Sequence, residues 1–108
     1  MSWVITQSGN AINLDRMAEL WFEDGTGRDY EPISVLKASE PARLEDVDGD
    51  DRVFAVSHEV CVVLGSSDYA TPLIRALLAA IRARAFVEIA DVVEEAGFML
   101  WHHMNHHP

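Results

Sequence analysis

The chain has 108 residues, of which 49% are hydrophobic, with 18 acidic and 8 basic side chains and a net charge of −10. This length suits one domain with a single core, residues 1–108. The acidic balance argues against direct nucleic-acid binding and against an anionic membrane surface as partner, because both need clustered Lys and Arg.

The sequence does not indicate export or membrane insertion. Apolar runs stay well short of the roughly 20 residues that a membrane-spanning helix needs. Residues 1–10 lack the basic and apolar regions of a secretion signal. Because the chain holds a single cysteine, Cys61, it cannot form an internal disulfide. We therefore expect a cytoplasmic protein.

The first residues predict a β-hairpin. Residues 3–6, Trp-Val-Ile-Thr, are β-prone, and residues 7–10, Gln-Ser-Gly-Asn, have the composition of a turn. Residues 11–14 then resume the apolar pattern, which completes the hairpin.

The next segment fits two patterns. Residues 17–22 satisfy a helical period as well as an alternating one, and we interpret them as a strand because Asp15 and Arg16 allow a kink before it. Residues 23–27, Glu-Asp-Gly-Thr-Gly, are predicted to form a loop.

The middle of the chain alternates β-rich and acidic stretches. Residues 32–38 are interpreted as a strand, and residues 40–51 as a loop because of their proline, glycine and acidic content. Residues 52–64 are the most β-rich segment. Thirteen residues are long for one strand, so we expect the polar residues 57–59 to divide it into a hairpin.

The C-terminal half predicts helices. Thr71 and Pro72 form a start signal, because a hydroxyl can cap the helix and proline suits its first turn. A second helical segment is expected over residues 90–96, with residues 98–101 packed back on the body. One stripe of the first helix must be buried, since its apolar residues recur at a helical period: Leu73, Ile74, Leu77, Leu78, Ile81 and Ala85.

Together these elements predict an α+β fold. A bent antiparallel sheet of about five strands over residues 3–65 is followed by a long amphipathic helix and a shorter helix within residues 71–96. A histidine-rich tail covers residues 97–108.

The order of short motifs resembles a group of small uncharacterised bacterial and phage-type proteins. Those motifs are Trp-Val-Ile-Thr at residues 3–6, Asn-Leu-Asp at residues 13–15, Val-Val-Leu-Gly-Ser-Ser at residues 62–67 and Phe-Val-Glu-Ile at residues 86–89. The resemblance implies an antiparallel sheet closed by a helix, similar in outline to pleckstrin-homology-like domains. It implies no catalytic residue.

The tail is the most suggestive candidate for metal chemistry. On a helix it would place His102 with His106, and His103 with His107, at the spacing that lets two imidazoles bind one Zn or Ni ion. Further ligands would come from His58, Cys61, Glu94 or Glu95. The alternative is a frayed terminus whose histidines have no metal-binding role, and we favour it.

An acidic surface is the second candidate site. The residues proposed to contact a partner are Glu45, Asp46, Asp48, Asp50, Asp51 and Trp21, joined on one face by Asp15, Glu19, Glu23, Asp24, Asp29 and Glu31. Such a surface would attract a basic protein, and an exposed tryptophan would concentrate binding energy. Cys61 lies in an apolar run, which favours a buried, inert thiol.

No pattern in the sequence demands catalysis, so we predict a non-enzymatic module that binds a protein partner or a second copy of itself. One alternative is a metal- or small-ligand-binding regulator that uses the terminal histidines. Another is a phage-type acidic antagonist of a host nucleic-acid-binding protein. We expect no resident cofactor outside the metal alternative.

Overall fold

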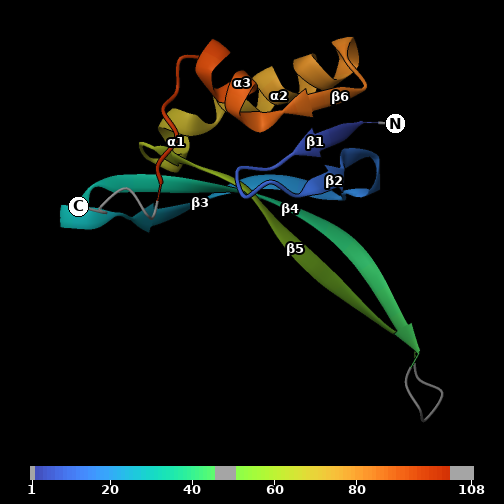
Figure 1. Cartoon of the computed structure of the whole chain (residues 1–108). Helices are drawn as coiled ribbons and strands as arrows, with labels where there is room; N and C mark the ends of the chain where they lie inside the picture. The colour runs from blue at the N-terminus through green and yellow to red at the C-terminus, as the bar shows by residue number, and fades with distance from the viewer. Residues whose placement is uncertain (1, 46–50, 103–108) are drawn as a thin grey trace.

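The structure, a computed structural model, describes residues 2–45 and 51–102, with the backbone alone for residues 42–45 and 51–55. The fold is α+β, as predicted, and the long helix follows the main sheet (Figure 1). The strands described form two sheets of three, so the single five-stranded sheet is wrong. The elements are β1 Trp3–Ile5, β2 Ala11–Asn13, β3 Glu19–Thr26, β4 Pro32–Glu45, β5 Asp51–Leu64, α1 Ser67–Ala70, α2 Pro72–Ala83, β6 Phe86–Glu88 and α3 Ile89–Glu95.

The smaller sheet has the order β2-β1-β6. β1 and β2 form the antiparallel hairpin that the sequence predicts. β6 lies parallel to β1, with Phe86 in register with Trp3, inside a range expected to be helical. Its pattern is that of a strand, because Val87 is buried between two exposed neighbours. α3 then supplies the expected second helical segment.

The larger sheet has the order β3-β4-β5, and both pairs are antiparallel. Residues 23–26 belong to β3 and residues 40–45 to β4, so the loops predicted there begin too early. β5 is one strand, and the predicted hairpin break at residues 57–59 is wrong. The pairing register of β4 and β5 shifts by one residue between Leu36 and Lys37, and β5 accommodates the extra residue as a β-bulge without ending.

The long helix α2 begins at Pro72, as predicted, but the short helix α1 precedes it. α1 begins at Ser67, where Ser66 Oγ accepts from the Tyr69 N–H at 3.3 Å. Asp24 also accepts from the Ser67 N–H and hydroxyl, at 2.7 and 2.9 Å. The Thr71 hydroxyl donates to the Ser67 carbonyl at 2.7 Å and does not cap. Pro72 then opens α2, because its missing N–H costs nothing in a first turn.

The core lies between the two sheets and the helices (Figure 1). Leu36 on β4 and Val60 on β5 are fully buried, as are Leu73 and Leu77 on α2. None of the helices described is long and apolar enough to cross a membrane.

Candidate interaction surface

β4 and β5 extend well beyond the rest of the sheet. The last β3–β4 pair is Glu19 with Ser39, whereas the β4–β5 pairs continue to Glu45 with Asp51. At about 3.4 Å per residue, this two-stranded ribbon reaches roughly 20 Å past the end of β3. We call it the arm and define it as residues 40–45 and 51–56. Figure 1 shows it projecting away from the helices and both sheets.

The arm dominates the shape of the molecule. The radius of gyration is 15.5 Å and the longest dimension is 51 Å. A compact domain of this length has a radius of gyration of about 13 Å. Among the side chains described, those of the core cluster end at Ala38 on β4 and resume at Val60 on β5. The arm therefore extends outside the core.

The direction of the backbone groups distinguishes the two edges of the arm. The Ala18 N–H donates to the Ser39 carbonyl at 2.8 Å, so the polar groups of Ser39 face β3 and point away from β5. Because this direction alternates along a strand, the nitrogen of Pro41 also points away from β5. Proline has no N–H, so the free edge of β4 lacks a donor there.

The opposite edge keeps its donors. Ala55 is paired with Pro41, so the N–H and C=O of Ala55 point away from β4. By the same alternation, so do those of Val53 and Ser57. We call these three residues the free edge of β5. Among the described residues, only β4 pairs with β5 from Asp51 to Glu59, so no described segment covers the edge of β5 that faces away from β4.

The same edge of β5 is covered as soon as the strand enters the body. Residues 99–101 run antiparallel to it, with the Leu64 N–H donating to the Met99 carbonyl at 2.9 Å and the Trp101 N–H to the Val62 carbonyl at 2.8 Å. Gln7 bridges the two segments. Its Oε1 accepts from the Val62 N–H at 2.7 Å, and its Nε2 donates to the Trp101 carbonyl at 2.8 Å.

The Gln7 bridge yields a stability prediction. Gln7→Ala leaves the Val62 N–H and the Trp101 carbonyl without their partner, so we expect the free energy of unfolding to fall by about 1–3 kcal/mol. Urea denaturation and hydrogen exchange of the Val62 amide, which loses its acceptor, measure the effect. Gln7→Glu separates the two bonds: it keeps the acceptor for the Val62 N–H but sets a carboxylate oxygen against the Trp101 carbonyl, so it should also lower the free energy of unfolding while the Val62 amide stays protected from exchange. An unchanged free energy of unfolding in Gln7→Ala would show that the bridge is dispensable.

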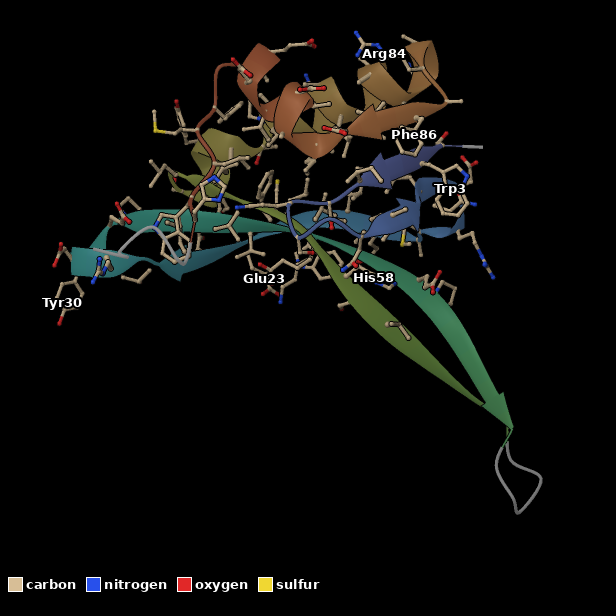
Figure 2. The ribbon with its side chains drawn as sticks, viewed as in Figure 1. Trp3, Glu23, Tyr30, His58, Arg84 and Phe86 are labelled. Atoms are coloured by element: carbon tan, nitrogen blue, oxygen red, sulfur yellow. The ribbon has the colours of Figure 1, made fainter. Side chains whose placement is uncertain are left out.

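Polar and apolar side chains mark the root of the arm. His58 Nε2 lies 3.7 Å from Glu40 Oε1, and Figure 2 shows His58 where β5 leaves the body. Val56 is 39% exposed. At the opposite end of the sheet, Tyr30 is 92% exposed and has a positive φ of 62°. Figure 2 places Tyr30 far from His58.

The predicted partner-binding residues fall into two places. Glu45 and Asp51 pair at the end of the arm, while Asp46, Asp48 and Asp50 lie outside the described residues. Trp21 is half-buried on β3, and its indole N–H donates to Glu23 Oε1 at 3.3 Å. Hydrogen bonds from Lys37 and Trp21 lower the pKa of Glu23, whose carboxylate lies 2.8 Å from Lys37 Nζ.

Several acidic residues of the body serve the fold. Asp24 holds the start of α1, and Glu31 Oε1 accepts from the Trp101 indole N–H at 2.6 Å. Asp15 accepts from the Ser2 N–H at 2.9 Å. These carboxylates accept hydrogen bonds from other residues of the chain, so part of the acidic face expected from the sequence stabilises the fold.

The predicted metal ligands are only partly described. His102 is exposed, and its Nδ1 lies 3.4 Å from Gln7 Nε2. His103, His106 and His107 lie outside the described residues. Within the described residues, no three histidine, cysteine or acidic side chains gather around one point, so His58, Cys61, Glu94 and Glu95 do not form a cluster with His102.

Cys61 lines a pocket of about 510 Å³ together with Gln7, Val60, Trp101 and His102. Its side chain is 1% exposed, and burial, with the nearby Glu59 carboxylate, raises the pKa of the thiol to about 12. The thiol is therefore protonated at neutral pH and is a poor nucleophile.

Alkylation tests the state of Cys61. Relative to an ordinary thiol of pKa 9.0, a pKa of about 12 reduces the thiolate fraction at pH 8 by about a thousandfold. We expect iodoacetamide to modify the folded protein at least a hundredfold more slowly than the urea-unfolded chain, as followed by mass spectrometry. Comparable rates in the two states would contradict a buried thiol.

The raised pKa of Cys61 also predicts a pH dependence of stability. Because the folded-state pKa is raised, the free energy of unfolding should fall as pH rises from about 9 toward 12.

Sequence reasoning missed Gln7 and the free edge of β5. Gln7 lies in a segment with the composition of a turn, and no neighbouring residue in the sequence indicates that its side chain contacts Val62 or Trp101. Pro41 is the one local signal of a strand edge, but the composition around it favours the loop predicted over residues 40–51, whereas the structure places it in β4. Comparisons with protein-family models, with curated proteins and with solved structures found no match.

Proposed function

We propose that this protein is a non-catalytic interaction module and that the arm is the element that contacts another protein chain. The observation that carries the proposal is the extension of β4 and β5 beyond Ser39, where β3 no longer covers the sheet. A ribbon held outside the core adds little to the body's own packing, so its length calls for another role.

Physical chemistry supports a binding role for such a ribbon. Two-stranded hairpins on their own are marginally stable in water, and a third strand is the usual source of added stability. A free sheet edge is also a template for another extended segment, which it binds through main-chain hydrogen bonds. The free edge of β5 offers those groups at Val53, Ala55 and Ser57.

Site-specific photocrosslinking tests the proposal. A benzophenone amino acid at Val56 places the reactive group on the arm, and the same amino acid at Tyr30 is the matched control. Tyr30 is also an exposed position, but it lies at the opposite end of the sheet. In cells that naturally contain the protein, we expect Val56 to give covalent adducts with a protein chain and Tyr30 to give none.

Mass spectrometry then identifies the captured chain as a second copy or a different protein. Either product at Val56 alone supports an interaction through the arm. Adducts at Tyr30 alone, equal adducts at both positions, or none at Val56 would overturn the proposal.

A further inference from the structure

We infer that the free edge of β5 pairs with the same edge of a second copy, so that the two arms form one continuous antiparallel ribbon. This inference rests on the proposed function, because it names the partner that the arm contacts. The occupant is a second copy of this chain.

The free edge of β5 is self-complementary. A two-fold axis beside Ala55 sets Ala55 opposite the partner's Ala55, and Val53 opposite the partner's Ser57. All three residues direct both N–H and C=O outward, so each pair can exchange two hydrogen bonds, as antiparallel bonded pairs do. One geometry therefore satisfies every outward group from Val53 to Ser57.

The other edge of the arm explains why assembly would stop at two copies. A ribbon with two competent edges could add strands without limit. Pro41 removes a donor from the free edge of β4, at the position opposite Ala55. The edge of β5 is then the one whose donors are uninterrupted, and an isologous pair buries both copies of that edge at once.

The sequence of the edge also suits a second copy. Residues 53–57, Val-Phe-Ala-Val-Ser, carry no formal charge, so desolvating them brings no like charges together. A basic partner would instead be attracted to the acidic residues, which lie outside residues 53–57. At the two ends of the paired region, Asp51 would lie opposite the partner's Glu59.

The charges give the dimer a distinctive salt dependence. Each copy carries a net charge of −10, and the end pairs are acidic in both copies. Salt screens this repulsion, so the dissociation constant of the dimer should stay constant or fall as NaCl rises from about 0.05 to about 0.5 M. A dissociation constant that rises steeply with salt would instead indicate attraction between opposite charges.

Amide hydrogen exchange, combined with sedimentation equilibrium of the full chain, tests the inference directly. In the dimer, amides of the free edge of β5 should be protected together with those of Phe54 and Val56, which face β4. On dilution below the dissociation constant, only Val53, Ala55 and Ser57 should lose protection. The alternation of the loss identifies the edge, because melting of the arm would expose all five amides.

A substitution provides the matched comparison. Ala55→Pro deletes an outward N–H and leaves the β4–β5 bonds in place, whereas Ala55→Ser keeps the N–H. By symmetry, one substitution removes two intermolecular bonds, so we expect Ala55→Pro to weaken the dimer about tenfold to a hundredfold. Ala55→Ser should match the natural chain. Continued protection of the Phe54 and Val56 amides in Ala55→Pro confirms that the arm still forms.

The outcomes separate the two proposals. A chain that stays monomeric at every concentration, or a dimer whose Val53, Ala55 and Ser57 amides exchange freely, overturns the edge-to-edge dimer. If Val56 nevertheless crosslinks to a different protein, the interaction module stands and only its partner changes. If Val56 crosslinks to nothing, the interaction module fails as well.

Discussion

Replacing Leu77 by Ala will lower the free energy of unfolding by about 2–5 kcal/mol, the range for a large aliphatic side chain removed from a packed core. Replacing Leu78 by Ala, one position further along α2, will lower it by less than about 1 kcal/mol. Leu77 is 0% exposed and Leu78 is 38% exposed. Urea denaturation followed by tryptophan fluorescence measures both variants against the natural chain.

The pair of substitutions controls for helix propensity. Both exchange leucine for alanine inside the same helix, so the intrinsic preference of the backbone changes by the same small amount. The difference between the two variants then reports packing alone. Equal losses in Leu77→Ala and Leu78→Ala would show that α2 does not pack on the sheets through the face that contains Leu77.

The α2 stripe shows how far periodicity predicts a buried face. Spacing alone placed Leu77 and Leu78 on one apolar stripe. Successive residues are rotated by about 100° around a helix, so Leu78 points well to one side of Leu77. The apolar stripe is therefore wider than the part of α2 that the core covers, and Leu78 lies at the margin of the stripe. Ala85 lies beyond the end of α2. Periodicity thus predicted the helix and its face, while the width of the contact depended on the partner surface.

The strands were predicted least well where their pairing partner is distant in sequence. Residues 40–45 have the proline and acidic content of a loop, yet they pair with residues 51–56. The composition describes each residue's own preference, and β preference depends strongly on context. Local sequence also suggested a break in residues 57–59, but continuous pairing with β4 keeps them within one strand.

The candidate surface depends on directions that a sequence does not contain. Pro41 and Ala55 are visible in the sequence, but their roles follow from the Ala18–Ser39 hydrogen bond, which fixes which backbone groups point outward. The acidic residues show that exposure to a partner cannot be predicted from charge alone. Asp24 and Glu31 looked like free surface charges, yet each accepts hydrogen bonds from residues more than 40 positions away.

Shortening the arm will separate association from folding. Replacing residues 41–55 by Asn-Gly joins Glu40 to Val56, a bonded pair whose backbone groups face each other, through a tight type I′ turn. Because the described core cluster has no member in the arm, we expect the free energy of unfolding to stay within about 1 kcal/mol of the natural value. The variant should sediment as a monomer at every concentration tested.

Two measurements on that variant decide the role of the arm. Its urea denaturation curve shows whether the body folds without the ribbon, and its sedimentation velocity profile shows whether association survives. A loss of several kcal/mol would make the arm part of the folding unit, because its removal would then disrupt packing near Ala38 and Val60. Association that persists in a well-folded variant would place the interface on the body. A stable monomer would leave the arm as the part of this chain that has little effect on its own fold and forms the contact with the next chain.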